Sequence, residues 1–167
     1  AKATVVGAGI VPVSLLAALV ASGPQADGVR IVAAFLVLLA AIGLTDDRWG
    51  LASGLRLLCY LVVGLLTPWL MFPESALSGA ALIAMGIGVA WCINLFNFMD
   101  GADGLATAQL LCVSVGLGLM AHFGLSDYPY WVVWCAWAAT CCLPLLWLNW
   151  PPAKLFMGDA GSIPLGF

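Results

Sequence analysis

Charged side chains are scarce in this chain of 167 residues, and their scarcity excludes most classes of protein. Only 8% of the residues are Asp, Glu, Lys or Arg, whereas 64% are hydrophobic. Because a soluble globular domain carries about 25% charged residues, a water-soluble enzyme is excluded. Five Lys and Arg residues, a net charge of -3 and the lack of a basic stretch exclude a nucleic-acid-binding protein. The composition therefore indicates a polytopic membrane protein.

Histidine and paired cysteines are also lacking, which argues against a zinc site. The chain has one histidine, His122, and its six cysteines include no C-x-x-C pair. All six cysteines fall within apolar stretches, where we expect them to act as small buried hydrophobic side chains. A secreted disulfide scaffold is excluded as well.

The chain contains several long uncharged, apolar stretches. The uncharged stretches cover residues 3–26, 31–45, 57–73, 75–99, 104–126 and 128–153. A helix needs about 20 apolar residues to cross the hydrocarbon core, and helices satisfy their own backbone hydrogen bonds in lipid. We therefore predict an all-α transmembrane helix bundle with about six spans and the start of another. The predicted spans are 5–22, 29–45, 55–72, 77–97, 104–122 and 129–149.

The basic residues predict which loops face the cytoplasm. Six crossings place the loops after spans two, four and six on one face. Four of the five basic residues fall on that face, and only Arg30 falls on the other. Because Lys and Arg are enriched in cytoplasmic loops, we predict that this face is cytoplasmic. It also carries five carboxylates from loops far apart in sequence: Asp46, Asp47, Asp100, Asp103 and Asp159.

The first of these loops holds the adjacent carboxylates Asp46 and Asp47, followed by Arg56. Two like charges this close are mutually unfavourable unless a cation or a basic partner compensates them. Taken alone, such a pair is also typical of a solvated helix boundary.

The second loop combines two amides and two carboxylates at the base of two spans. Asn94 and Asn97 are three residues apart and share a face if helical, and Asp100 and Asp103 follow, each before a glycine. Gly104 opens the next span, whose N-terminal amides we expect to be able to face a phosphate. An ordinary Asx-rich turn is the alternative.

The third loop contributes Asn149, Lys154 and Asp159, the last flanked by Gly158 and Gly161. Oxygen ligands without His or Cys favour Mg²⁺, or Mn²⁺, over softer metals. Mg²⁺ commonly uses one or two carboxylates together with substrate phosphates. The three loops together predict phosphoryl-group chemistry at the membrane surface.

Three motifs in this order resemble those of the polyprenyl-phosphate N-acetylhexosamine-1-phosphate transferases. They are Asp46-Asp47-Arg48 with Leu55-Arg56-Leu57-Leu58, then Asn94-x-x-Asn97-x-x-Asp100-Gly101-x-Asp103-Gly104-Leu105, then Phe156-Met157-Gly158-Asp159-x-Gly161-Ser162. The phospho-MurNAc-pentapeptide transferases form a related branch. Phe98-Met99 is closer to the branch that initiates O-antigen, and so lipopolysaccharide, synthesis.

The resemblance implies a Mg²⁺-dependent enzyme of the bacterial inner membrane, part of cell-surface and cell-wall biogenesis. It would transfer a sugar-1-phosphate from a UDP-N-acetylhexosamine to undecaprenyl phosphate and release UMP. Asp159 and Asn97 would be metal-site residues. The carboxylates of Asp46, Asp47, Asp100 and Asp103 would act in the chemistry on acceptor phosphate or nucleotide sugar. The implied substrate-binding residues are Arg56, Asn94, Asn97, Asn149 and Lys154.

Two departures from the family pattern accompany the resemblance. A Pro-Arg-Gly-Gly-Gly-like loop usually precedes the first span, where this chain has Thr4-Val5-Val6-Gly7-Ala8-Gly9, and the later loop with paired histidines is not in this sequence. Because the chain starts at Ala1 and stops at Phe167 as a new apolar run begins, we expect residues 1–167 to be one transmembrane catalytic domain truncated at both ends.

Other interpretations stay open at this point. A cation- or proton-coupled transporter would also carry membrane carboxylates, although transporters tend to place them near mid-membrane rather than at span ends. A purely structural membrane subunit leaves the three motifs unexplained. Small residues such as Gly64, Gly86 and Gly116 permit helix contacts, including those of a homodimer, without specifying them.

Overall fold

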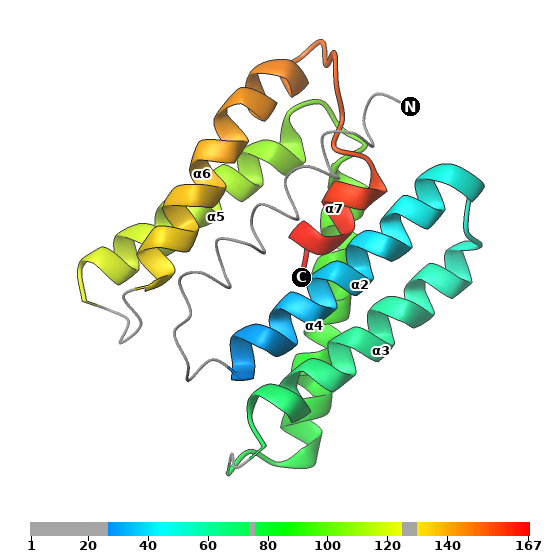
Figure 1. Ribbon diagram of the computed structural model, residues 1–167, viewed down its shortest axis with the longest axis vertical. Helices are drawn as coiled ribbons and strands as arrows, with labels where there is room; N and C mark the ends of the chain where they lie inside the picture. The colour runs from blue at the N-terminus through cyan, green and yellow to red at the C-terminus, as the bar shows by residue number, and fades with distance from the viewer. Residues whose placement is uncertain (1–26, 74–75, 125–129) are drawn as a thin grey trace.

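The computed structural model describes residues 27–73, 76–124 and 130–167, and these form helices without strands. Figure 1 shows the six helices in chain order. They are α2 (Asp27–Trp49), α3 (Ser53–Met71), α4 (Gly79–Met99), α5 (Leu105–His122), α6 (Tyr130–Asn149) and α7 (Asp159–Leu165). The helices α2 to α6 coincide with five of the predicted spans, and three of them, α3, α4 and α5, qualify as candidate membrane spans. The sixth predicted span, 5–22, lies outside the described residues.

The chain is a multi-pass membrane protein. Within the described residues, three helices are long and apolar enough to cross a bilayer: Ser53–Met71, Gly79–Met99 and Leu105–His122. Large apolar side chains cover their outer surfaces, and Trp91 and Phe98 are 64% and 79% exposed. Such an exterior is stable against lipid and unfavourable in water.

The end of α2 differs from the sequence prediction. We predicted that the span stops at residue 45 and that Asp46 and Asp47 lie in a loop, whereas α2 continues to Trp49. The helix ends where Gly50 adopts a φ of 68°, and the Gly50 amide donates to the carbonyl of Asp46 at 2.8 Å. Glycine at this position is a common helix stop, so the backbone signal rather than the first charge determined the boundary.

Two glycines bring α3 and α4 into close contact. A Cβ atom on Gly64 would lie 2.5 Å from the carbonyl oxygen of Gly86, and one on Gly86 would lie 2.7 Å from the Cα of Leu65. These small residues therefore serve packing within the chain. Gly116 has nothing within 4 Å of its Cβ position.

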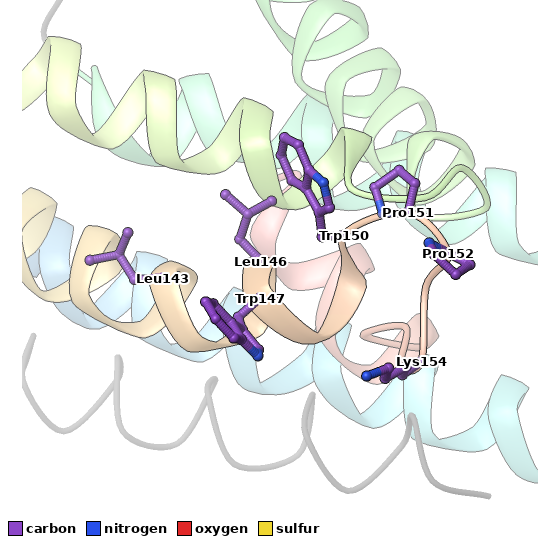
Figure 2. A pocket seen from close by; sticks show the side chains of 7 residues that line it. All are labelled: Leu143, Leu146, Trp147, Trp150, Pro151, Pro152 and Lys154. Carbon is purple, nitrogen blue, oxygen red and sulfur yellow. The ribbon is translucent and has the colours of Figure 1, made fainter.

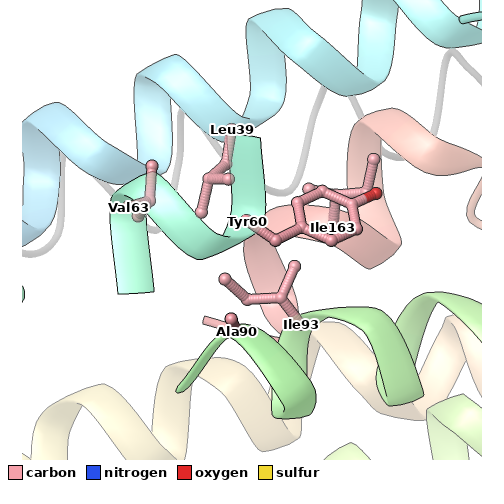
Figure 3. Close-up of a cluster of buried hydrophobic side chains, with 6 residues drawn as sticks. All are labelled: Leu39, Tyr60, Val63, Ala90, Ile93 and Ile163. Carbon is pink, nitrogen blue, oxygen red and sulfur yellow. The ribbon is translucent and has the colours of Figure 1, made fainter. Parts of the chain in front are cut away.

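The short helix α7 fills the space beside α2 and α4 (Figure 1). The expected start of another span is thus a helix of seven residues that contains Pro164. Residues 160–164 are all buried, and Ile163 joins the main core cluster (Figure 3). The other buried members of this cluster are Leu39, Tyr60, Val63, Ala90 and Ile93. Packing in this core therefore holds Asp159, the first residue of α7, beside the last turn of α2 and the first turn of α3.

Candidate active site

Four helix ends meet at one end of the bundle and bring the predicted motifs together. The last turn of α2 and the first turn of α3 supply Asp46 and Arg56, the last turn of α4 supplies Asn97, and α7 begins with Asp159. Hydrogen bonds link these residues, and the bonded pair Arg56 and Asp159 is separated by 103 positions in the chain. We call these four residues the central cluster.

Arg56 joins two carboxylates within the central cluster. One guanidinium nitrogen, Nη1, donates to Oδ2 of Asp46 at 2.5 Å and to Oδ2 of Asp159 at 3.0 Å. The other oxygen of Asp46 accepts from the backbone amide of Leu51. A single guanidinium group thus compensates part of the repulsion between two neighbouring carboxylates.

Asn97 holds the opposite side of Asp159. Its amide nitrogen donates to Oδ1 of Asp159 and to Oγ of Ser162, both at 2.8 Å. Among the described residues, its amide oxygen receives no hydrogen bond. Asn97 therefore both orients Asp159 and offers a hard oxygen beside it.

Partial burial raises the pKa of the Asp159 carboxyl group. Its side chain is 27% exposed, and desolvation, with Asp46 as the next cause, raises its pKa to about 6. The hydrogen bond from Asn97 opposes this rise because it favours the ionised carboxylate. A cation beside Asp159 would compensate the charge that the protein compensates only in part.

Asp47 caps α7 rather than joining the central cluster. Its two carboxylate oxygens accept from the backbone amides of Asp159 and Ala160, each at 3.1 Å. Free amides at a helix N-terminus are well satisfied by a carboxylate. Asp47 therefore holds the N-terminus of α7, which begins with Asp159, in a fixed position.

Asp100 and Asp103 accept hydrogen bonds from the segment that connects α6 to α7. Asp100 is 7% exposed, and its oxygens lie 3.5 Å and 3.1 Å from the amides of Met157 and Gly158. Desolvation raises the pKa of Asp100 to about 6, against the effect of these amides. The exposed Asp103 accepts from the amide of Ala153 at 3.0 Å.

Asn149 also forms hydrogen bonds with backbone groups of other segments, from a buried position inside the bundle. It is 1% exposed, and its Oδ1 accepts from the amide of Gly104 at 2.8 Å and from the hydroxyl of Thr107 at 3.2 Å. Its nitrogen donates to the carbonyl of Leu155. The Gly104 amide, which we expected to be able to face a phosphate, is therefore occupied by a side chain.

Three of the predicted substrate-binding residues do not join the central cluster: Asn149, described above, Asn94 and Lys154. The side chain of Asn94 makes no hydrogen bond with a described residue. Lys154 is exposed and lines an open groove of about 580 Å³ at the end of α6, together with Trp147, Trp150 and the two prolines that follow (Figure 2). The structure thus places Lys154 beside an aromatic and apolar surface rather than beside Asp159.

Three residues that shape the site were missed by the sequence analysis. Ser162 accepts from Asn97, and Tyr60 lies buried one helical turn beyond Arg56. At Gly43 a Cβ atom would lie 2.2 Å from the backbone carbonyl oxygen of Asp159. Ser162 belongs to the third motif and had a sequence signal, whereas Gly43 and Tyr60 resemble ordinary span residues.

The donor set fits a cation that is shared with substrate rather than enclosed by protein. No group of three acidic, histidine or cysteine side chains gathers as a metal site in the part of the chain that the structure describes. The carboxylate of Asp159, with Asp46 close by, and the amide oxygen of Asn97 are groups that could supply oxygen ligands to a metal ion. One or two carboxylates with open positions suit Mg²⁺ that also binds phosphates.

Comparison with known proteins identifies the family. Residues 29–167 match the family described as glycosyl transferase family 4, and this match includes all three motifs. The chain belongs to this family. The family resemblance indicated by the three sequence motifs is therefore confirmed.

Relatives in this family cover most of the chain. The phospho-N-acetylmuramoyl-pentapeptide-transferase of Acaryochloris marina is 32% identical over 160 residues, which cover 81% of this chain and 42% of that protein. The decaprenyl-phosphate N-acetylglucosaminephosphotransferase of Mycolicibacterium smegmatis is 37% identical over 151 residues, covering 77% of this chain and 36% of that protein. The chain thus spans less than half the length of these relatives.

Proposed function

We propose that this chain belongs to an enzyme that transfers a sugar-1-phosphate from a UDP-N-acetylhexosamine to undecaprenyl phosphate and releases UMP. The observation that carries the proposal is the meeting of Asp46, Arg56, Asn97 and Asp159 at one end of a membrane helix bundle. The names of the two relatives above, a pentapeptide transferase and an N-acetylglucosaminephosphotransferase, support the class of reaction.

The acceptor needs little help from a general base. A phosphate monoester has a second pKa of about 6, so the acceptor phosphate is mostly dianionic at neutral pH and already nucleophilic. The main barrier is repulsion between the acceptor phosphate and the pyrophosphate of the donor. Preorganised donors and positive charge at the site lower such a barrier. Arg56 is the group of the central cluster that can donate to both phosphates.

Asp159 and Asn97 would hold Mg²⁺, with Asp46 next to them. Mg²⁺ bound there would supply positive charge between the two phosphate groups and orient the donor pyrophosphate. Mn²⁺ suits the same oxygen ligands. Asn97 orients the Asp159 carboxylate by its hydrogen bond, so that the carboxylate is preorganised before substrate arrives.

The remaining predicted site residues would act mainly by building the floor of the nucleotide-sugar site. All four accept hydrogen bonds from backbone amides of α7, of the connection between α6 and α7, or of the start of α5: Asp47, Asp100, Asp103 and Asn149. Their side chains keep this connection in place, and it presents Asp159 to the substrates. Asn94 and Lys154 would contact substrate groups that lie beyond the central cluster.

The proposed location is the cytoplasmic side of the bacterial inner membrane. The site end of the bundle carries Arg48, Arg56 and Lys154, whereas Arg30 belongs to the first turn of α2 at the other end. The lipid-linked product would start a cell-surface polysaccharide, and Phe98-Met99 favours O-antigen over peptidoglycan.

Reconstitution tests the proposal. The full-length protein in lipid nanodiscs is supplied with undecaprenyl phosphate, Mg²⁺ and, in separate reactions, UDP-N-acetylglucosamine or UDP-N-acetylgalactosamine. UMP release that requires undecaprenyl phosphate supports the transfer. The absence of UMP with every UDP-N-acetylhexosamine tried, together with cation flux in proteoliposomes, would instead support a transporter.

A further inference from the structure

The hydroxyl of Tyr60 is buried without a hydrogen-bond partner, alone among the side-chain groups that the structure describes. Tyr60 is 1% exposed, and its ring packs in the core cluster beside Ile163 (Figure 3). A buried unpaired hydroxyl destabilises a protein relative to a phenyl ring of the same shape. Packing therefore accounts for the ring and leaves the oxygen unexplained.

This hydroxyl lies at the border between the apolar core and the central cluster. Tyr60 follows Arg56 by four residues in α3, so both side chains lie on one face of that helix. Arg56 in turn donates to the carboxylates of Asp46 and Asp159. Figure 3 shows the ring of Tyr60 reaching across to α7, the helix that begins with Asp159.

Arg56 has competing partners once a phosphate is present. In the structure its Nη1 donates to the carboxylates of both Asp46 and Asp159. A phosphate group attracts a guanidinium group at least as strongly as a carboxylate does. When Arg56 turns to a phosphate, Oδ2 of Asp159 loses its donor in a half-buried position, which is unfavourable unless another donor replaces it.

We propose that Tyr60 is a positioning residue whose hydroxyl donates to the Asp159 carboxylate when Arg56 turns to a phosphate group of the substrate. The inference rests on the proposed function, because that function supplies the phosphate ligands. Tyr60 touches no substrate and acts through Arg56 and Asp159. Its hydroxyl keeps Asp159 oriented while the arginine is engaged elsewhere.

Tyr60→Phe tests the role because it removes the oxygen and keeps the ring. The probe is inorganic pyrophosphate with Mg²⁺, titrated by calorimetry into the full-length protein in nanodiscs. We expect the variant to bind pyrophosphate about tenfold more weakly, since a hydrogen bond to a charged group is lost. Its unfolding temperature should be unchanged or higher, since an unpaired buried hydroxyl is removed. The matched control is Thr67→Val, which removes the α3 hydroxyl that bonds the Val63 carbonyl and should leave the affinity unchanged.

A double-mutant cycle with Arg56→Gln separates a positioning role from a structural one. In that background Tyr60→Phe should add less than a twofold loss, because no arginine leaves Asp159. Equal pyrophosphate affinity of the Tyr60→Phe variant and the wild type would overturn the proposal, as would a wild type that binds no pyrophosphate. A lowered unfolding temperature of Tyr60→Phe would also overturn it. If the affinities differ as expected but no UDP-sugar reacts, the proposed function fails and the role of Tyr60 stands.

Discussion

Asp159 and Asp46 both accept a hydrogen bond from the same nitrogen of Arg56, but their other contacts differ and so do their expected roles. Asp159 is also held by Asn97 and starts a helix, whereas the second oxygen of Asp46 accepts from the Leu51 amide. Asp159 therefore has one oxygen facing Arg56 and the other facing the amide group of Asn97. Asp46 serves mainly to place Arg56 and to balance its charge.

Removing the charge of Asp159 should reduce activity more than removing that of Asp46. We expect Asp159→Asn to lower kcat by about 100-fold or more, the usual scale for losing a central electrostatic group, and Asp46→Asn to lower it about tenfold. UMP release at saturating Mg²⁺ measures both. Asp27→Asn, at the opposite end of α2, is the control. An inactive Asp46→Asn beside an Asp159→Asn that keeps substantial Mg²⁺-dependent turnover would reverse the ranking.

Protonation should couple stability to pH and to Mg²⁺. Burial raises the pKa of both Asp159 and Asp100 to about 6, so the folded protein holds these protons more tightly than the unfolded chain. The stability that this supplies is present below about pH 4 and is lost as pH rises through 6.

Thermal unfolding in nanodiscs measures this coupling. With EDTA, the unfolding temperature should fall as pH is raised from 5 to 7. Mg²⁺ should raise the unfolding temperature at pH 7 and have little effect at pH 5, where Asp159 is protonated. An equal effect of Mg²⁺ at both pH values would contradict Asp159 as a cation ligand.

At the scale of elements, α7 is the part that makes the site. It has only seven residues, and an isolated helix of this length is unstable in water. Its position comes from the Asp47 cap, from burial of residues 160–164 and from the close approach to Gly43 on α2. Asp159 is therefore oriented by packing rather than by its own helix.

Gly43→Ala should displace α7 although alanine is the better helix former. Its Cβ atom would lie 2.2 Å from the Asp159 carbonyl oxygen, so the backbone of α7 must move. We expect lower stability and at least a tenfold loss of UMP release, since small misplacements of catalytic groups are costly. Gly88→Ala is the matched control in α4, where nothing lies within 4 Å. It should be neutral or slightly stabilising. Similar behaviour of both variants would argue against the close approach.

The sequence predicted the helices well because long apolar runs have few alternatives in a membrane. It was wrong about the end of α2, since the first charge at Asp46 ends the apolar run but Gly50 ends the helix. The motifs also indicated which residues meet, including Asn97 and Asp159. Tyr60 and Gly43 had no such signal, because their importance lies in what packs against them.

At the scale of the whole molecule, one end of the bundle carries the motifs and most of the basic residues. The ends of α2, α4 and α6 and the starts of α3 and α7 are joined there by hydrogen bonds between side chains and backbone. The α5–α6 pair and the group formed by α2, α3, α4 and α7 lie on either side of this junction (Figure 1). The connection between α6 and α7 bridges the two parts.

Accessibility labelling tests this sidedness. In a background without the native cysteines, Arg48→Cys and Lys154→Cys should be protected from a membrane-impermeant maleimide added to intact spheroplasts. Leu77→Cys and Phe123→Cys, exposed residues at the other end, should react. Labelling of Arg48→Cys and Lys154→Cys from opposite sides would contradict a single site face.

The sequence by itself determined that this chain is a helical membrane protein, and it predicted that five of its eight acidic residues lie at one end of the helices. Hydrophobic length, charge spacing and motif order are local properties of the chain, so no tertiary information was required. Only the tertiary structure decided which polar groups surround Asp159 and which hold backbone amides instead. That division depends on distances between helix ends and on which hydrogen-bond partners remain unoccupied, and both arise only when distant segments pack together.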